Sequence, residues 1–365
     1  MTPMRIAVVG LRSFPSTYSG IERTGEELYP RLIERGHQVT VFGGASSERP
    51  RPHSAVRLLR APSLPFARVE TLSRALAALP MITRSRFDVV HLHAVAPAGT
   101  APLFRFAGVP TVATIHGLDA RRARWRGAGA AVLRLCERTA VRYAHRMIVV
   151  SRELRDYFWA TYRRDTTLIY NAIAECSPAV LPARPRSYMV FIGRLVPEKR
   201  VIDLIGAFRT IPDDLDLVIA GTGPSDHRAE LLHAAGGDRR IRFIGHQGRA
   251  AVRSLLAGAV LFASPSELEG FPMAVLEAVA ASVPVVVTDI PPHRELFAAI
   301  GGDAALVPTG DRAEIAARIR HVLACASEER TAARVLAARV VEVFNVTRMV
   351  EETERVLADA AWGIA

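Results

Sequence analysis

The residue types best suited to a phosphorylated ligand lie in one short segment, FIGRLVPEKR (191–200). Arg194 and Lys199 are five residues apart and follow an apolar run that predicts a strand. Two cations beside a strand end can clamp a diphosphate without a metal and neutralise the charge that grows on a leaving group. Lys199 is also the only lysine among 47 basic residues. Because an ammonium group is more compact than a guanidinium group, we predict a specific role for it. The alternative is a solvated basic loop.

Two carboxylates, Glu269 and Glu277, lie within SPSELEGFPMAVLEAVAAS (264–282). Glu277 falls inside an apolar run, and a buried carboxylate is costly unless hydrogen-bond donors satisfy it. The vicinal hydroxyls of a ribose or a hexose would supply two such donors. The alternative is that Glu277 faces solvent or pairs with an arginine, and that Glu269 is a charge on a loop.

A helix is predicted to begin between these two carboxylates. Pro272 fits the first helical position, where its missing N–H does no harm. The N–H groups of Met273 and Ala274 would then be free at the positive end of the helix. Such a helix end is suited to binding an anion.

Three histidines lie on or beside predicted strands. His91 and His93 are two residues apart on one strand, so both side chains point to the same face. They could form half of a metal site, but no carboxylate lies nearby at ligand spacing, and we favour core histidines with satisfied hydrogen bonds. His116 ends another strand, before Gly117, and is placed to donate to a substrate oxygen.

Two glycine-containing loops follow predicted strands. GLRSFPSTYSG (10–20) ends at Gly20, which would let the backbone approach a ligand closely. GTGPSD (221–226) begins like a dinucleotide fingerprint but has Asp226 where the third glycine should be. Neither loop has the spacing of a phosphate-binding or dinucleotide-binding motif, and plain turns are the alternative.

The positive charge is confined to the N-terminal half of the chain. The formal net charge is +11, yet residues 1–186 contain 28 Arg against 13 Asp and Glu, a net charge of +15. Arg134, Arg138 and Arg142 are four residues apart and form one stripe on a predicted helix, and Trp125 lies among further arginines. Basic faces with an aromatic residue are typical of contact with an anionic membrane surface. The alternative is a solvated helix face.

Length and composition exclude several classes of protein. A chain of 365 residues corresponds to about two domains. Its three cysteines lack the number of a disulfide scaffold and the spacing of a zinc site. The sequence has no run of eighteen apolar residues, and its first apolar run is too short for a signal peptide. We therefore expect a cytoplasmic protein.

Short Val- and Ile-rich runs alternate with helical stretches, which include 20–35 and 328–360. The predicted strands are 5–10, 38–44, 88–93, 111–116, 146–151, 188–193, 216–221, 241–245, 259–264 and 284–288. Such runs joined by helices predict parallel sheets covered on both faces. They form two series around a proline-containing joint at 177–187, which predicts two Rossmann-like domains with a ligand site at the strand ends, in the cleft between them.

Taken together, these motifs resemble glycosyltransferase family four. Residues 264–277, with their two carboxylates, resemble the acidic motif of that family, and GRLVPEK (193–199) resembles its diphosphate clamp. GTGP (221–224) matches its loop after the second strand of the C-terminal domain. The opening (4–28) and TIHGLDARRARW (114–125) are similar to a bacterial subgroup that includes rhamnosyltransferases.

The resemblance implies an α/β protein of the GT-B fold, with two Rossmann-like domains whose parallel sheets face each other across a cleft. Residues 1–176 would form the acceptor-side domain, 177–345 the nucleotide-sugar domain, and 346–365 a helix that crosses back to the first domain. It also implies a retaining hexosyltransferase that moves a sugar from a nucleotide sugar to a hydroxyl of a glycan or lipid-linked acceptor. Cell-envelope or exopolysaccharide assembly is the implied role, with no metal or other cofactor required.

Single residues also receive roles from this resemblance. Arg194 and Lys199 would hold the diphosphate, while Glu269 and His116 would orient the transferred sugar, and these four would be the catalytic residues. Glu277 would hold the ribose. The other donor-binding residues would be Gly20, Gly221, Ile244, Gly245, Gly270, Phe271, Pro272, Met273 and Ala274. Arg200 departs from the family, which usually has glycine after the clamp lysine.

The expected partners are a nucleotide-sugar donor, a glycan or lipid-linked acceptor, and an anionic membrane surface that the basic half would contact. The protein would then be peripheral on the cytoplasmic face of the membrane, without a nucleic-acid partner. Three alternatives remain open. They are a nucleotide-sugar epimerase or hydrolase on the same fold, a basic nucleic-acid-binding protein, and a metal hydrolase that uses His91 and His93.

Overall fold

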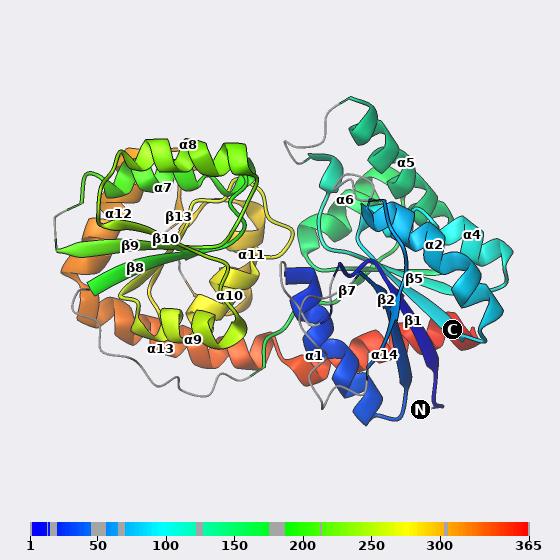
Figure 1. Cartoon of the computed structure of the whole chain (residues 1–365). Coiled ribbons are helices and arrows are strands. Elements are labelled where there is room, and N and C mark those ends of the chain that lie inside the picture. Colours follow the sequence, from blue (N-terminus) through cyan, green and yellow to red (C-terminus); the bar gives the residue numbers. More distant parts are fainter. Residues whose placement is uncertain are drawn as a thin grey trace. The chain divides into compact units, whose positions relative to one another are not determined.

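The structure, a computed structural model, divides the chain into two compact units. Met1–Ala172 and Val346–Ala365 form the first, and Ile173–Asn345 form the second (Figure 1). The residues described are 2–12, 14, 20–44, 56–64, 70–121, 127–174, 187–211, 214–302 and 306–363.

The first unit contains a seven-stranded parallel sheet with the order β3-β2-β1-β4-β5-β6-β7. Its strands are β1 (Arg5–Val9), β2 (Gln38–Gly43), β3 (Arg57–Arg60), β4 (Val89–His93), β5 (Thr111–Ile115), β6 (Arg146–Val149) and β7 (Thr167–Leu168). Every residue of β4 and β5 is buried. This burial follows from the helices that cover both faces of the sheet.

Helices α1 (Gly20–Glu34) and α14 (Val346–Trp362) contact each other, and α14 lies against β4 and β5. The opposite face carries α2 (Glu70–Arg84), α4 (Ala101–Phe106) and α5 (Ala128–Tyr143), as Figure 1 shows, and α3 (Val95–Ala98) packs with them. The remaining helices are η1 (Asp119–Arg121) and α6 (Arg152–Tyr162). The two faces differ in chemistry, because β4 directs His91 and His93 toward α1, whereas Val90 and Leu92 point to the other side.

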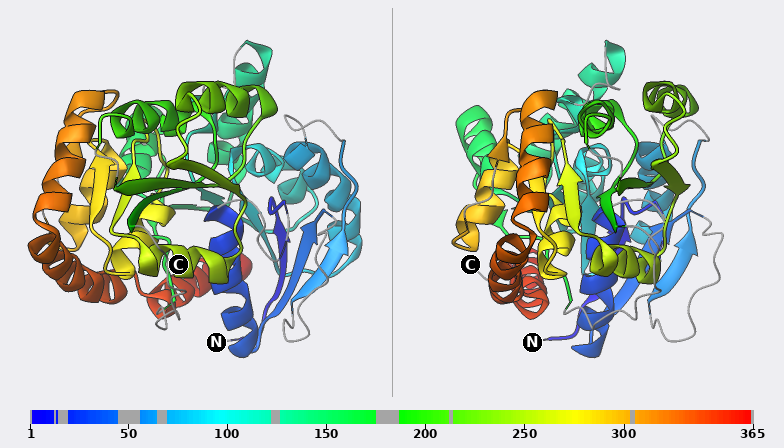
Figure 2. Two further views of the ribbon diagram at one scale, coloured as in Figure 1. Left: turned by 60° about the vertical axis from the view of Figure 1, so that its left-hand side comes forward. Right: turned by 90° about the vertical axis from the view of Figure 1, so that its left-hand side faces the viewer.

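The second unit contains a six-stranded parallel sheet with the order β10-β9-β8-β11-β12-β13. Its strands are β8 (Ser187–Ile192), β9 (Leu215–Ala220), β10 (Ile241–Gly245), β11 (Leu261–Ser264), β12 (Val285–Thr288) and β13 (Leu306–Val307). One face packs on α7 (Val201–Phe208), α8 (Ser225–Ala235) and α12 (Arg312–Ala324) around a fully apolar core. The other helices are η2 (Pro197–Lys199), α9 (Arg249–Gly258), α10 (Met273–Ala280), α11 (Pro291–Ala299) and α13 (Ala326–Val343). Figure 2 shows this unit from two further sides.

The predicted parallel α/β architecture is confirmed, and each of the ten predicted strands is present within two residues of its expected bounds. The prediction missed β3, β7 and β13, which are short and lie at sheet edges. Edge strands of two to four residues carry too little hydrophobic pattern to be recognised. The helical stretch expected at 328–360 is two helices, α13 and α14, which end and begin on either side of Phe344 and Asn345.

Ion pairs join α14 to the rest of the first unit. The Glu354 carboxylate accepts hydrogen bonds from Arg35 at 2.6 Å and from His37 at 2.8 Å, and its side chain is almost fully buried. Asp359 pairs with Arg146 at 3.0 Å. Burial alone would raise the pKa of Glu354, but the hydrogen bonds from His37 and Arg35 outweigh it and lower that pKa. The carboxylate therefore stays ionised and holds the helix.

Two glycines are required where strands end close to a neighbouring backbone. Gly10 follows β1 with a φ of +111°, and a Cβ there would lie 2.3 Å from the His93 carbonyl oxygen. Gly221 follows β9 with a φ of +146°, and a Cβ there would lie 1.8 Å from the Gly193 oxygen. Neither position can hold a side chain unless the adjacent strand end moves.

Candidate functional site

Lys199 and Glu269 form an ion pair at the carboxyl ends of two adjacent strands of the second unit. Lys199 ends η2, which follows β8, and Glu269 lies on the loop between β11 and α10. The two side chains are 17% and 11% exposed. Burial would raise the pKa of Glu269, but the charge and the hydrogen bond of Lys199, with smaller contributions from His293 and Ser266, lower it. The site therefore presents a charged, partly accessible pair.

The loop that carries Glu269 is held by backbone and hydroxyl contacts. The Glu267 N–H donates to the Glu198 carbonyl at 3.0 Å, which joins the loop to η2. Thr288, at the end of β12, donates its hydroxyl hydrogen to the Ser266 carbonyl, and the hydroxyls of Ser264 and Ser266 lie 3.1 Å apart. These contacts fix the loop on both sides of the ion pair.

His293 is a member of this site that the sequence analysis missed. It lies near the start of α11 and is fully buried, and its Nδ1–H donates to the Thr288 carbonyl at 2.7 Å. Burial lowers the pKa of His293 even though Glu269 opposes the shift, so the ring is neutral near pH 7. Its Nε2 has no hydrogen-bond partner among the described residues. A histidine five residues after a predicted strand was the available signal.

Arg200, immediately after the lysine, has a backbone conformation that glycine adopts more readily. Its backbone is left-handed, with a φ of +51°. Nε of Arg200 donates to Asp203 at 2.7 Å, and Nη1 lies 3.5 Å from Glu267. Asp203 also accepts from Arg312 at 3.0 Å. This cluster offsets the strain of a left-handed conformation in a residue with a Cβ.

The start of α10 differs from the prediction in one respect. Pro272 caps the helix instead of occupying its first position. The Met273 N–H donates to the Phe271 carbonyl at 3.0 Å, so the expectation that this N–H is free at the helix end was wrong. The chain forms a tight turn at Phe271 to Met273, which uses that donor. Gly270, Phe271 and Met273 are all buried.

Glu277 lies inside α10 and is 6% exposed. The alternative in which it faces solvent is therefore wrong. It lies about one turn into the helix, and the apolar pattern around it buries that face against the rest of the unit. The carboxyl group is thus held within the packed part of α10.

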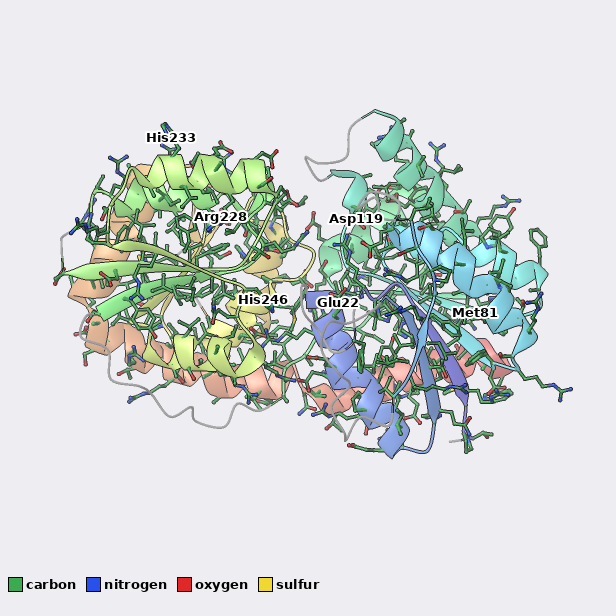
Figure 3. The ribbon with its side chains drawn as sticks, viewed as in Figure 1. Glu22, Met81, Asp119, Arg228, His233 and His246 are labelled. Carbon is green, nitrogen blue, oxygen red and sulfur yellow. The ribbon has the colours of Figure 1, made fainter. Side chains whose placement is uncertain are left out.

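Two of the expected donor-binding residues, Ile244 and Gly245, lie at the end of β10. Ile244 and Gly245 are partly exposed, and the Gly221 N–H donates to the Gly245 carbonyl at 2.8 Å. Figure 3 labels His246, the exposed residue that follows them. Since the backbone of Gly193 already demands a glycine at 221, the glycine itself is no evidence of ligand approach.

In the first unit, His116 follows β5 and is 8% exposed. Its Nε2 lies 3.0 Å from Nδ1 of His93, and its Nδ1 has no hydrogen-bond partner among the residues described. Tyr29 of α1 contacts both His91, at 3.0 Å, and His93. The interpretation of His91 and His93 as satisfied core histidines is confirmed.

Burial decides the protonation of these histidines. Together with a smaller effect of His116, it lowers the pKa of His91 to about 3. It likewise lowers the pKa of His116 to about 3, and burial with the two neighbouring rings lowers that of His93. Burial also raises the pKa of Tyr29. All four groups are therefore uncharged near neutral pH.

Gly20 begins α1, and its carbonyl accepts from the Thr24 hydroxyl at 3.0 Å. Glu22, labelled in Figure 3, is buried at the start of the same helix, and its carboxylate accepts from the Arg12 N–H at 3.1 Å. This contact joins the helix start to the loop after β1. Residues 13 and 15–19 of that loop lie outside the described residues.

The arginine stripe predicted on residues 134–142 is exposed on α5. Large apolar side chains accompany it on α4 and α5. We define the α4–α5 patch as Leu103, Arg105, Phe106, Val132, Arg134, Leu135, Arg138 and Arg142, which lie at the surface of these two helices. Phe106 is 81% exposed and Leu135 61%. Trp125, expected in the same region, lies outside the described residues.

No group of three or more His, Cys, Asp or Glu side chains is arranged to hold a metal ion in the part of the chain that the structure describes. Within the same residues, every helix is too short or too polar to span a bilayer.

Comparison with known families assigns both units. Residues 18–175 match Glycosyltransferase Family 4, and residues 177–337 match Glycosyl transferases group 1. The two matches together cover most of both units. The chain belongs to the glycosyltransferases of family four.

Individual relatives are distant. The chain is 32% identical to the uncharacterized glycosyltransferase YqgM of Bacillus subtilis over 56% of this chain and 59% of that protein, less than two thirds of the relative's length. It is 29% identical to a GDP-mannose-dependent alpha-mannosyltransferase of Mycolicibacterium smegmatis over 88% of this chain and 89% of that one. It is also 29% identical to a phosphatidyl-myo-inositol mannosyltransferase of Mycobacterium leprae, over 86% of each chain.

Solved structures confirm the GT-B fold. The sucrose-phosphate synthase of Thermosynechococcus elongatus has a TM-score of 0.84 and 19% identity, with 97% of this chain and 98% of that chain covered. Anabaena Alr3699/HepE, in complex with UDP and glucose, has a TM-score of 0.82 and 19% identity, with 98% and 100% covered.

Proposed function

We propose that this glycosyltransferase moves a hexose, with retention, from a nucleotide diphosphate sugar to a hydroxyl of a glycan or lipid-linked acceptor in cell-envelope or exopolysaccharide assembly. The observation that carries the proposal is the Lys199–Glu269 pair at the carboxyl ends of β8 and β11. Ligands of doubly wound sheets bind at this edge. A cation and a carboxylate there match the two halves of the donor, a diphosphate and a sugar.

The proposed chemistry needs no protein nucleophile. Lys199 and Arg194 neutralise the charge that develops on the departing diphosphate, which lowers the barrier to its release. The acceptor hydroxyl attacks the anomeric carbon from the same face, as the bond to the phosphate oxygen breaks. The hydroxyl proton passes to that leaving oxygen. Glu269 orients the sugar by accepting hydrogen bonds from its hydroxyls, as does His116 by donating one.

The relatives support a nucleotide-sugar donor. One is described as GDP-mannose-dependent, and HepE of Anabaena was solved with UDP-glucose as well as with UDP and glucose. These donors differ in base and in sugar but share the diphosphate, which is the part that Lys199 and Arg194 would contact. The donor is therefore proposed by class, as a nucleoside diphosphate hexose.

A thermal-shift panel with UDP, GDP, ADP and dTDP, and with their hexose conjugates, tests the site. A ligand that binds only the folded state raises the melting temperature. We expect one base to give a shift that Lys199→Met abolishes, while Arg334→Ala, which removes an exposed cation of the same unit, leaves it intact. Equal shifts in Lys199→Met and the wild type would contradict the proposed clamp.

An assay with and without acceptors then tests transfer and its stereochemistry. The proposal expects donor turnover to depend on an acceptor, and the anomeric configuration of the product to match that of the donor. Conversion of the nucleotide sugar at full rate without any acceptor would contradict transfer. An inverted anomeric centre in the product would contradict the retaining mechanism alone.

We also propose that the protein binds the cytoplasmic surface of an anionic membrane through the α4–α5 patch. Apolar side chains such as Phe106 and Leu135 can enter the headgroup region, while the arginines of the patch attract anionic lipid. The relative from Mycobacterium leprae is described as acting on phosphatidyl-myo-inositol, which supports a membrane-borne acceptor. The net charge of +15 on residues 1–186 also favours binding to an anionic membrane.

Sedimentation with vesicles of neutral or anionic lipid tests this surface. We expect binding that rises with anionic lipid and falls with salt, because the attraction is screened. The double variant Phe106→Ser, Leu135→Ser should bind severalfold more weakly. A control with two exposed apolar residues changed in the second unit, Leu232→Ser and Val335→Ser, should bind as the wild type does. Equal binding to neutral and anionic vesicles would contradict the proposal.

A further inference from the structure

Five buried side chains of the first unit form a continuous line of hydrogen bonds. Thr114 Oγ1 lies 2.7 Å from Nε2 of His91, and Nδ1 of His91 lies 3.0 Å from the Tyr29 hydroxyl. That hydroxyl also bonds Nε2 of His93, and Nδ1 of His93 lies 3.0 Å from Nε2 of His116. The line ends at Nδ1 of His116, which is buried and has no partner among the described residues. An unpartnered polar atom at a strand end points to a ligand.

The number of protons in this line allows only three arrangements. Each neutral ring carries one N–H, and each hydroxyl carries one O–H, so four contacts share five hydrogens. In the first arrangement the Thr114 hydroxyl donates to His91, His91 to Tyr29, Tyr29 to His93, and His93 to His116. The His116 hydrogen is then on Nδ1. In the second arrangement each of these bonds has the opposite direction, and Nδ1 of His116 is a bare acceptor. In the third, the Tyr29 oxygen accepts from both His91 and His93, its own hydrogen is not used, and Nδ1 of His116 is again bare.

The Thr114 hydroxyl distinguishes the first arrangement from the second. In the first, its hydrogen is used in the bond to His91. In the second, its oxygen accepts from His91 and its hydrogen needs another acceptor, and within the described part of the chain no second partner lies in reach. Thr114 is buried, so that unsatisfied hydrogen would carry the desolvation penalty of a buried donor. The third arrangement leaves the hydrogen of the fully buried Tyr29 hydroxyl without an acceptor among the described residues, at the same penalty. Since Nδ1 of His116 is unpartnered in all three arrangements, the first leaves the fewest unsatisfied groups.

We propose that Tyr29, His91 and His93 are positioning residues that fix His116 as the tautomer with its hydrogen on Nδ1, and that this N–H donates to a ligand oxygen. The ligand half of the proposal rests on the proposed function, whereas the tautomer is a property of the free protein. His116 cannot accept a proton at Nδ1 unless its own hydrogen and that of His93 both move to the other nitrogen of their rings. The site thus offers a neutral hydrogen-bond donor at this point instead of a base.

The tautomer can be read directly by long-range proton–nitrogen correlation spectra of the full chain with ¹⁵N-labelled histidine. We expect the His116 signals, identified by their loss in His116→Gln, to show a protonated Nδ1 and a bare Nε2 at pH 7.5 without ligand. A protonated Nε2 in the wild type would overturn the proposal.

Two variants test the coupling through the line. Tyr29→Phe removes the central hydroxyl, and Thr114→Val removes the terminal one with little change of shape. Each should convert His116 to a mixture of tautomers, and Thr114→Ser, which keeps the hydroxyl, should restore the wild-type pattern. If one variant fails to fold, the other still gives the result. A pure Nδ1–H signal in both variants would show that the line does not set the tautomer.

Turnover separates this inference from the proposed function. If both hold, Tyr29→Phe should lower kcat with the nucleotide sugar roughly tenfold, the value of one lost hydrogen bond in the transition state. A changed tautomer with unchanged turnover would overturn the proposal that His116 donates to a ligand oxygen. The proposal that the line fixes the tautomer would still hold. Absence of transfer in the wild type, with the predicted tautomer present, would count against the proposed function instead.

Discussion

Lys199 is already paired in the free protein, and this pairing has a consequence for the ligand. A diphosphate that binds Lys199 must compete with the Glu269 carboxylate for the same ammonium group. Both side chains are mostly buried, so the competing charges are poorly screened. The Glu269 carboxylate can separate from the ammonium group at little cost only if other hydrogen-bond donors, such as sugar hydroxyls, replace the ammonium. The donor as a whole then fits the pair better than either half alone.

This competition predicts opposite effects of two substitutions. Lys199→Met should weaken binding of the nucleoside diphosphate at least tenfold, because it removes the cation. Glu269→Gln should leave that binding unchanged or tighter, because it frees the ammonium, yet it should lower transfer at least tenfold. Calorimetric titration with the diphosphate and a transfer assay measure the two effects. A similar loss of affinity in both variants would argue against separate phosphate and sugar roles.

The neutral histidines of the first unit predict a specific acid sensitivity. The folded pKa values of His91 and His116, about 3, lie below the unfolded value of about 6.5. Between these values the unfolded chain binds more protons. Stability is thus fully present above about pH 6.5 and is lost as the pH falls toward 3, by about 1.4 kcal/mol per pH unit for each histidine.

Urea unfolding at pH 7, 6 and 5 measures this loss of stability, when it is followed with a spectroscopic probe attached to the first unit. Tyr29→Phe retains the buried histidines and should keep the same dependence on pH, although its stability at pH 7 is lower. A first unit equally stable at pH 7 and pH 5 would show that these rings are protonated without cost.

At the scale of the elements, the site depends on how closely strand ends approach one another. The turn after β9 passes so near the end of β8 that Gly221 has no room for a Cβ. Adjacent parallel strands fix this distance, and the residues after β8, including Arg194 and Lys199, depend on it. The glycine is therefore a requirement of the sheet as well as a candidate ligand contact.

Gly221→Ala should destabilise the second unit by about 3 kcal/mol or more, because its Cβ overlaps the Gly193 oxygen and its φ is positive. Gly248→Ala is a matched control in the same unit, since its φ is negative and nothing lies within 4 Å of the new Cβ. It should cost about 1 kcal/mol or less, as expected at a helix N-cap. Chemical denaturation compares the two variants, and equal losses would rule out the steric overlap as the cause.

At the scale of the whole molecule, the chain passes twice between its units, after Ala172 and after Asn345. A backbone bridge joins Ile173 to Asn345 at this point. The last helix follows the second unit in sequence but packs in the first, where Glu354 meets Arg35 and His37. The first unit is therefore incomplete until the second has been synthesised.

Glu354→Gln should destabilise the first unit by roughly 3 kcal/mol, because it leaves a buried hydrogen-bonded cluster without its charge. Glu351→Gln on the same helix is the control. Glu351 is 44% exposed and lies 3.9 Å from Arg35, so its loss should cost less than about 1 kcal/mol. The lowered pKa of Glu354 means that its contribution is present above about pH 4.3 and is lost as the pH falls below that value. Hydrogen exchange of α14 amides reports the release of the helix.

Much of the architecture was predictable, because the strands of a covered parallel sheet are continuous apolar runs. The site was predictable in part. Lys199 and Glu269 stood out by residue type and by position after a strand, as did His116. Tyr29 and His293 did not, since a tyrosine in an amphipathic helix and a histidine after two prolines are both common in proteins without any part in binding.

The sequence by itself determined the family, the ten principal strands, the uneven distribution of charge and the residues that could meet a diphosphate sugar. These properties are local, because each depends on residue types within one segment. The tertiary structure alone decided that Lys199 pairs with Glu269, that Met273 uses its N–H in a turn, and that five side chains form one line ending at His116. Each of these contacts joins groups by distance and direction, which are set only when separate elements pack.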